Sequence, residues 1–253
     1  MIASVLQPSV AQGIAVSQKY PSISGKVVLL TGSTGAMGRH LVDAFLHAGA
    51  RLALCVRRMA NLPDLELALA NHIDDTAIIP CDLRYEENVV RLIHRVVHRF
   101  GQIDVVVNAA SILGPREFVM NYPADPWRDV IATNATAPYL VCREALPWMK
   151  RQNSGAIINV TSSLTRDTKA KRGAYLVACH AVEGLTKLLA CELKDTNIRV
   201  NSIDIGRMGD DVQPVASPQH WVPAFLWAAS DDCRQSGERI SITDFDPGGS
   251  VRI

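Results

Sequence analysis

Short apolar runs alternate with longer stretches of helical spacing from Lys26 almost to the end of the chain. Strands that are apolar throughout and separated by helices are typical of parallel sheets covered by helices on both faces. The alternation contains no repeat, linker or low-complexity segment, so it predicts one doubly wound α/β domain with a parallel sheet of about seven strands. The runs predicted as strands are Val27–Thr31, Arg51–Val56, Thr76–Cys81, Ile103–Asn108, Ala156–Thr161, Arg199–Ile203 and Arg239–Phe245.

The predicted helices fill the intervals between these strands. They cover Arg39–Ala48, Glu86–Phe100, Trp127–Lys150, Tyr175–Leu193 and Pro223–Ser230. Residues 1–24 precede the alternation and lack the basic start and apolar block of a signal peptide. We expect them to form an N-terminal arm that is either disordered or packed on a neighbouring subunit, and residues 25–253 to form the domain.

The composition excludes several classes of function. Hydrophobic residues make up 48% of the 253 residues, and a formal net charge of +1 leaves no basic surplus for nucleic acid. No apolar run reaches the ~18 residues that a membrane span needs. The six cysteines form no C-x-x-C pair. We therefore expect no metal site, and mostly buried, reduced thiols in a cytoplasmic protein.

The first predicted strand runs directly into a glycine-rich loop, residues 31–38, and a helix follows. Glycines at such a junction permit a tight turn and let backbone N–H groups approach a pyrophosphate, which then faces the helix N-terminus. The position of the loop between a first strand and a first helix makes a dinucleotide site a specific prediction. The residues expected to contact the cofactor here are Gly32, Ser33, Thr34, Gly35, Met37 and Gly38.

The second predicted strand ends at Val56 and is followed by Arg57 and Arg58. Folds that prefer NAD usually carry an acidic residue at this point, where it binds the ribose 2′-hydroxyl. A guanidinium instead pairs with a 2′-phosphate through two hydrogen bonds. We therefore expect NADP(H) to be preferred over NAD(H), with Arg57 as the main determinant and Arg58 as the second.

Further motifs follow the glycine loop in a fixed order. Cys81-Asp82-Leu83 ends the third strand, Val107-Asn108-Ala109-Ala110 ends the fourth, and Ser162 precedes Tyr175 by 13 residues. Together with the loop they resemble the short-chain dehydrogenase/reductase family, from Gly25 to about Gly249. The glycine spacing is closer to that of the extended members and polyketide ketoreductases. This resemblance implies a Rossmann-type fold and hydride transfer between a nicotinamide and a carbonyl or alcohol carbon.

The resemblance also implies roles for individual residues. Tyr175 would be the general acid or base on the substrate oxygen, Ser162 would hydrogen-bond that oxygen, and Asn134 would support a proton relay. The segments that would contact the cofactor contain Asp82, Leu83, Asn108, Ala109 and Gly206, with Ala109 in place of the family's second asparagine.

The sequence departs from the family at the residue four positions after Tyr175. A lysine usually stands there, one helical turn away on the same face, and lowers the pKa of the tyrosine. This chain has Cys179 instead. If the lysine lowers that pKa by about two, its loss raises the cost of forming tyrosinate by roughly 2.7 kcal/mol. Alcohol oxidation near neutral pH should therefore be severely slowed.

Several residues could take over part of this role. His180 lies about 100° further around the helix and should point elsewhere. Lys169, Lys171 and Arg172 precede Tyr175 on the expected loop over the site, and one of them could fold back. Cys179 could itself act as a nucleophilic or redox thiol. The short segment between Asn201 and the last helix should also leave the pocket open to a large or carrier-tethered substrate.

The sequence leaves three functions open. The leading hypothesis is an NADP(H)-dependent carbonyl reductase, because a neutral tyrosine is already the acid that reduction requires. The second is a catalytically degenerate member that binds the dinucleotide or partners an active relative. The third is elimination or hydration chemistry without redox. The resemblance implies a homodimer or homotetramer formed through the two long helices, or a hetero-oligomer with an active relative.

Overall fold

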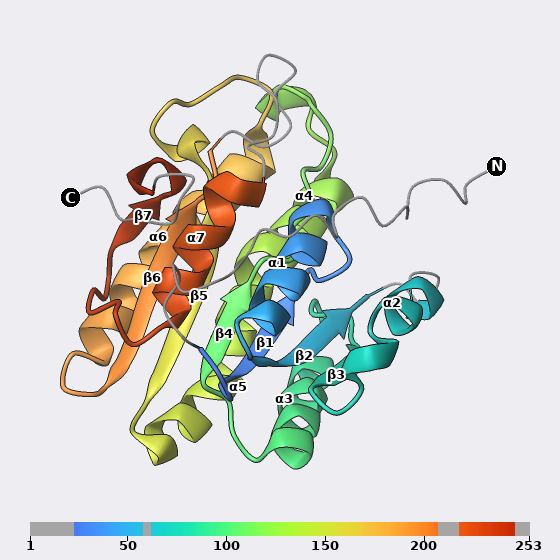
Figure 1. The fold of residues 1–253 in the computed structure, drawn as a ribbon. Helices are drawn as coiled ribbons and strands as arrows, with labels where there is room; N and C mark the ends of the chain where they lie inside the picture. The colour runs from blue at the N-terminus through green and yellow to red at the C-terminus, as the bar shows by residue number, and fades with distance from the viewer. Residues whose placement is uncertain (1–22, 58–61, 207–217, 246–253) are drawn as a thin grey trace.

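The computed structural model describes residues 23–57, 62–206 and 218–245. Within them, seven strands form one parallel sheet in the order β3-β2-β1-β4-β5-β6-β7 (Figure 1). The predicted doubly wound α/β fold is therefore confirmed. The strands are β1 (Val27–Thr31), β2 (Arg51–Val56), β3 (Thr76–Pro80), β4 (Val105–Asn108), β5 (Gly155–Thr161), β6 (Ile198–Asp204) and β7 (Arg239–Ser241).

Helices cover both faces of this sheet. In the view of Figure 1, α1 and α7 lie in front of the sheet, and α3, α5 and α6 pack against the other face. A short α4 precedes α5, and α2 follows β2. The bounds are α1 (Ala36–His47), α2 (Leu62–Ala68), α3 (Glu86–Phe100), α4 (Ala124–Ile131), α5 (Ala137–Gln152), α6 (Gly173–Glu192) and α7 (Pro218–Ala229).

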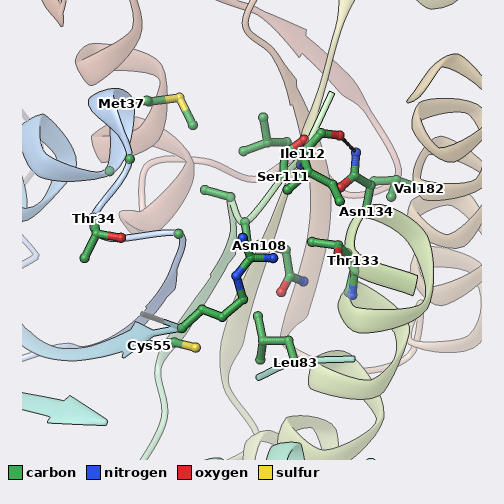
Figure 2. Close-up of a pocket in the computed structure, with 18 of the residues that line it drawn as sticks. Thr34, Met37, Cys55, Leu83, Asn108, Ser111, Ile112, Thr133, Asn134 and Val182 are labelled. Atoms are coloured by element: carbon green, nitrogen blue, oxygen red, sulfur yellow. Dashed lines mark hydrogen bonds between the residues drawn. The ribbon is translucent and has the colours of Figure 1, made fainter. Parts of the chain in front are cut away.

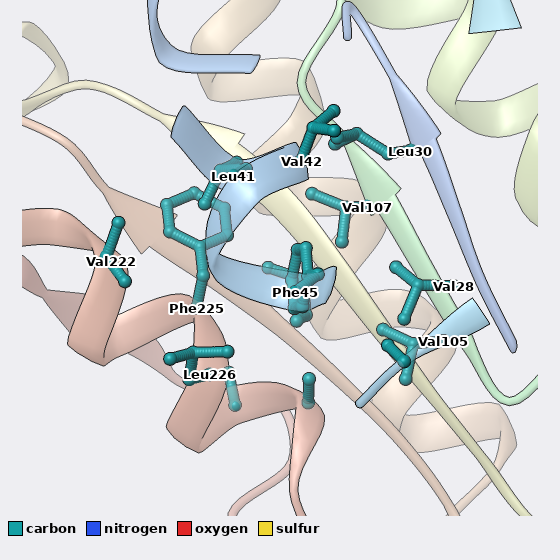
Figure 3. Close-up of a cluster of buried hydrophobic side chains, with 14 of the residues drawn as sticks. Val28, Leu30, Leu41, Val42, Phe45, Val105, Val107, Val222, Phe225 and Leu226 are labelled. Carbon is teal, nitrogen blue, oxygen red and sulfur yellow. The ribbon is translucent and has the colours of Figure 1, made fainter. Parts of the chain in front are cut away.

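The largest apolar cluster joins α1 and α7 to the front face of the sheet. Phe45 of α1 and Phe225 of α7 are both fully buried there, against valines of β1 and β4 (Figure 3). Ile23, within the expected N-terminal arm, also lies in this cluster with no exposed surface. The packed structure therefore includes at least this residue before Gly25.

One predicted helix is divided in the structure. The expected helix Trp127–Lys150 consists of α4, a π-helical turn over Ala132–Thr136, and α5. A π turn inserts an extra residue into the helical ladder and is frequent at functional sites. This turn buries Thr133 and Asn134, so the interruption turns the expected catalytic asparagine toward the protein interior.

The last predicted strand is too long. β7 ends at Ser241, because the hydroxyl of Ser241 accepts from the backbone of Thr243 and the Asp244 carboxylate accepts from the backbone of Ser241. This capping box starts a 3-10 turn in place of further strand. The short α2 was not predicted.

α6 is, within the described residues, the one helix long and apolar enough to cross a membrane by length and composition. It packs on β5 and β6, and its residues Leu189 and Val182 are buried there. The apolar character of α6 is therefore that of a core helix.

Candidate active site

A pocket of about 260 Å³ lies at the carboxyl ends of the central strands. β1 pairs with β4 here, at the point where the chain reverses the direction in which it adds strands. Ligands of open α/β sheets bind in the crevice that forms at such a reversal. The pocket runs from the glycine loop to Tyr175 and Cys179, so residues far apart in the sequence line one groove (Figure 2).

The glycine loop forms one end of the groove. A Cβ at Gly32 would lie 2.7 Å from the Ala109 carbonyl oxygen, and one at Gly38 would lie 2.1 Å from that of Gly32, so neither position admits a side chain. Gly35 is the N-cap of α1 and provides no side chain to cap the first-turn N–H groups. That helix end also carries no acidic residue. This arrangement fits a pyrophosphate at the N-terminus of α1.

The side chain of Ser33 points away from the groove. It is fully buried, and its hydroxyl donates to the Cys55 carbonyl at 3.1 Å. Thr34 and Met37 line the groove as expected (Figure 2). The predicted contact of Ser33 with a cofactor could therefore involve only its backbone.

Arg57 lines the pocket at the end of β2 and is exposed, while Arg58 falls outside the described residues. Asp82 and Leu83 also line it. The Asp82 carboxylate accepts from Arg84 at 2.7 and 3.0 Å, and the resulting hydrogen bonds hold its pKa below the usual value. The charge of Arg57 lowers that pKa further. The Asp82 carboxylate is therefore contacted directly by Arg84 and is stabilised in its charged form by Arg57 as well.

A second ion pair anchors this end of the groove to α4. Arg84 donates to Asp129 at 2.7 Å as well as to Asp82. Arg84 was not among the site residues predicted from the sequence, although it stands only two residues after Asp82 and can therefore reach the Asp82 carboxylate. Arg84 therefore fixes the wall of the groove next to Arg57.

The segment after β4 is held by internal hydrogen bonds. The Thr31 hydroxyl accepts from the backbone N–H groups of Ala109 and Ala110 at 3.0 and 3.1 Å. The Asn108 amide donates to Asn159 at 2.9 Å. Both Asn108 and Ala109 line the pocket, as the sequence predicts. The glycine loop and the segment after β4 are thereby tied to each other.

Asn134 uses its side chain to hold the neighbouring wall. Its amide oxygen accepts from the Ile112 N–H at 2.9 Å, and its amide nitrogen donates to the Ile112 carbonyl at 2.8 Å (Figure 2). Next to it, the buried hydroxyl of Thr133 has no hydrogen-bond partner within the described part of the chain. Asn134 is therefore part of the groove, with its side chain engaged by backbone.

Tyr175 and Cys179 lie one turn apart on α6 and both line the groove. Burial raises the pKa of Tyr175, and its interaction with the Cys179 side chain raises it further. A hydrogen bond with Ser162 and the charge of Arg172 act in the opposite direction and are outweighed. Tyr175 is therefore held in its neutral form.

The Ser162 hydroxyl lies beside Tyr175 but is also engaged by backbone. It donates to the Gly206 carbonyl at 2.7 Å and accepts from the Leu164 N–H at 3.4 Å. Ser162 is fully buried, and neither it nor Gly206 is among the residues that line the pocket. The Ser162 hydroxyl would therefore have to turn away from Gly206 before it could bind a substrate oxygen.

The structure distinguishes the candidates for the missing charge. His180 is exposed and does not line the pocket, as expected from its angle on the helix. Lys171 is exposed and places its ammonium 4.8 Å over the Phe118 ring. Arg172 is buried, with 7% of its surface exposed, and its charge lowers the pKa of Tyr175. Lys169 is half-buried and does not line the pocket. Of these cations, Arg172 is the one whose charge is known to act on Tyr175 within the described residues.

The Cys179 thiol does not fit the role of a nucleophile. Burial raises its pKa to about 11, with a smaller upward contribution from the Glu183 carboxylate. The thiolate is the nucleophilic form of cysteine, so Cys179 is almost entirely in its unreactive form near neutral pH.

Several groove residues were not predicted. They come from the ends of strands and the segments that follow them, from the π turn, and from α1, α5 and α6. Their only signal in the sequence is that they lie near motif residues. They are Ala36, Cys55, Cys81, Arg84, Ala110, Ser111, Ile112, Thr133, Pro138, Val160, Val182 and Ile205.

Comparison with known proteins gives a consistent result. The profile described as short chain dehydrogenase matches residues 26–220. The chain is 30% identical over 220 residues to the short chain dehydrogenase/reductase dpchG of Colletotrichum higginsianum, covering 86% of this chain and 79% of that protein. It is 29% identical over 229 residues to L-fucose dehydrogenase of Bos taurus, covering 90% and 74%.

Solved structures show the same fold. A short chain dehydrogenase from Pseudomonas syringae superposes with a TM-score of 0.80 at 28% identity, over 88% of this chain and 98% of that one. A short chain dehydrogenase from Escherichia coli complexed with NADPH superposes with a TM-score of 0.79 at 24% identity, over 87% and 97%. The chain therefore belongs to the short-chain dehydrogenase/reductase family, a family of oxidoreductases.

The raised pKa of Cys179 has a direct chemical consequence. At about pH 7, iodoacetamide should alkylate the exposed Cys191 well before Cys179, because burial keeps Cys179 protonated and shielded. Peptide mass spectrometry over a time course measures both rates. Alkylation of Cys179 as fast as that of Cys191 would contradict the raised pKa.

Proposed function

We propose that this protein is an NADP(H)-dependent reductase of a carbonyl group, with Tyr175 as the proton donor. The observation that carries the proposal is one continuous groove that joins the glycine loop, Arg57 and Tyr175. The glycine loop and the N-terminus of α1 would hold the pyrophosphate, and Arg57 would pair with the 2′-phosphate. The bound nicotinamide supplies the hydride. The E. coli relative complexed with NADPH supports this choice of cofactor.

The charge state of Tyr175 favours reduction. Burial and Cys179 both raise its pKa, so the residue is neutral and can donate a proton to the substrate oxygen. Oxidation of an alcohol needs the tyrosinate, which the same surroundings disfavour. Arg172 gives partial relief to the tyrosinate left after reduction, because its buried charge acts on Tyr175.

Ser162 and Asn134 take different parts in this proposal. The Ser162 hydroxyl lies within hydrogen-bonding reach of Tyr175, and rotation away from Gly206 would let it bind the substrate oxygen. The side-chain amide of Asn134 is committed to Ile112. We therefore assign Asn134 the task of holding the groove wall, in place of a proton relay through its side chain.

Turnover tests the proposal directly. We expect the purified protein to oxidise NADPH in the presence of a panel of apolar and sugar-derived carbonyl compounds. Tyr175→Phe should reduce kcat by about a hundredfold or more, because it removes the proton donor, while NADPH binding remains. Absorbance at the nicotinamide band measures the rate. Absence of turnover with every carbonyl, or equal rates for wild type and Tyr175→Phe, would contradict the proposal.

Arg57→Glu tests the cofactor preference. The variant should bind NADPH about tenfold to a hundredfold more weakly, because the carboxylate repels the 2′-phosphate that the guanidinium pairs with. NADH binding should be unchanged or stronger. Titration of nicotinamide fluorescence measures both affinities. Arg95→Glu makes the same charge change on α3 outside the pocket, so an equal loss in this control would assign the effect to long-range charge alone.

Cys179→Lys tests the effect of the missing charge. A lysine here would face the Glu183 and Asp204 carboxylates, which favour its charge, and the burial of the position and Arg239, which oppose it; we expect the two carboxylates to prevail. It should lower the pKa of Tyr175 and raise the rate of alcohol oxidation by about a hundredfold near neutral pH. The wild-type oxidation rate should still increase above about pH 9, since its tyrosinate forms only at higher pH, whereas the variant should level off earlier.

The pH profiles of alcohol oxidation by wild type, Cys179→Lys and Cys179→Ala separate two effects on the rate: the added positive charge and the loss of the thiol. Cys179→Ala removes the thiol without adding charge and should gain little. The same increase in both variants would show that the thiol itself inhibits. Identical profiles for all three proteins would exclude Tyr175 as the titrating base.

A degenerate, dinucleotide-binding subunit is the second candidate. The observation in its favour is that the polar side-chain groups of Asn134 and Ser162 are both engaged by backbone, and that of Tyr175 by neighbouring side chains. Such a subunit should bind NADPH without turnover and co-purify with an active family member. Size measurement of the isolated protein tests this, because a homodimer or homotetramer with its own turnover would contradict it.

A further inference from the structure

Arg239, the first residue of β7, lies behind the groove and contacts the ends of two other strands. One guanidinium nitrogen, Nη2, donates to the Asp204 carboxylate at 2.8 Å and to the Ser162 carbonyl at 3.1 Å. The other, Nη1, lies 3.5 Å from the Glu183 carboxylate of α6. A single side chain therefore joins β5, β6, β7 and α6.

The two carboxylates extend these contacts to the loops at the groove. Glu183 accepts from the hydroxyl groups of Thr161 and Thr165 at 2.8 and 2.9 Å, on either side of Ser162. The second oxygen of Asp204 accepts from the Gly206 N–H at 2.9 Å. Glu183 thus fixes side chains on either side of Ser162, near Tyr175. Asp204 fixes the backbone of the segment after β6.

Hydrogen bonds at Gly206 join the contacts of Asp204 and those of Ser162 into a closed ring that starts and ends at Arg239. Its carbonyl accepts from the Ser162 hydroxyl at 2.7 Å and from the Ser163 N–H at 3.2 Å. Starting from Arg239, one path leads through Asp204 to the N–H of Gly206, and the other leads through Ser162 to its carbonyl. Gly206 has a φ of +80°, and the preceding residue, Ile205, lines the groove. The position of Ile205 therefore depends on both paths.

The network is poorly accessible to water. Side-chain exposure is 13% for Arg239, 7% for Asp204 and 19% for Glu183. Charge-assisted hydrogen bonds in such surroundings are strong and directional. The Nε atom of Arg239 is buried without a hydrogen-bond partner among the described residues. Its orientation is therefore set by the carboxylates and the Ser162 carbonyl.

None of the three charged residues lines the groove, so they act through their neighbours. We propose that Arg239 is a positioning residue, which holds the loop of Ser162 and the segment of Ile205 and Gly206 in one arrangement at the nicotinamide end of the groove. The identity of that end rests on the proposed function. The contacts that Arg239 makes do not.

Binding of whole and partial cofactor tests the proposal. NADPH should bind Arg239→Lys about tenfold more weakly than wild type, because a lysine keeps the charge opposite Asp204 but cannot reach three partners at once. The fragment 2′,5′-ADP occupies the adenosine end alone, so its affinity should change less than about twofold. Arg199→Lys is the matched control, since the guanidinium of Arg199 likewise joins two partners, here the Ala228 and Ser230 carbonyls, and none of these three residues lines the groove.

Hydrogen exchange provides a readout that needs no ligand. In Arg239→Lys, the amides of Ser163 and Gly206 should exchange about tenfold faster or more, because the partners that hold their acceptors are loosened. The amides of β1 should exchange as in wild type. Arg239→Gln should show the same local pattern, and Arg239→Lys keeps the test valid if removal of the buried charge prevents folding.

The outcomes separate this proposal from the proposed function. Unchanged exchange at Ser163 and Gly206 in a folded Arg239→Lys would overturn the positioning role, as would equal losses of NADPH and 2′,5′-ADP affinity. Wild-type protein that fails to bind NADPH would contradict the proposed cofactor, and the exchange measurement would still decide the role of Arg239. The double variant of Ser162→Ala and Arg239→Lys gives a further test. If its loss of NADPH affinity equals the sum of the losses in the two single variants, that result would also count against a shared path.

Discussion

The parallel pairing of β1 with β4 determines where every functional group of this protein lies. It places the glycine loop beside the segment after β4, and the Thr31 hydroxyl joins the two through the N–H groups of Ala109 and Ala110. Since all strands in the described sheet are parallel, their carboxyl ends meet at one edge. The groove with Arg57, Asn134 and Tyr175 follows from that geometry.

Electrostatics at the other end of the groove set the direction of the chemistry. The residue one helical turn after Tyr175 is Cys179, and burial raises the pKa of Tyr175 with little compensation from Arg172. At Cys179, burial and the carboxylates of Glu183 and Asp204 oppose negative charge, and Arg239 offsets them in part. A site of this kind can donate a proton more easily than it can accept one, which is why reduction is the proposed reaction.

Much of the fold could be predicted from the sequence, because apolar periodicity reports burial directly. β1, β2 and α3 have the predicted bounds residue for residue. The single helix expected over Trp127–Lys150 was wrong, since the π turn is a change of backbone hydrogen bonding that periodicity does not register. β7 was predicted too long, because the Ser241 capping box ends it. In the site, Gly32, Asp82 and Tyr175 line one groove, whereas Ser33, Ser162 and Gly206 do not.

By itself, the sequence determined that the chain forms a doubly wound α/β domain with a glycine loop, and that the residue four positions after Tyr175 is a cysteine. These are properties of residue order and spacing. Only the tertiary structure decided that Ser162 donates to Gly206, that Arg84 joins Asp82 to Asp129, and that Arg239 joins four elements. Those contacts join residues up to 77 positions apart, so they depend on how the sheet brings strand ends together.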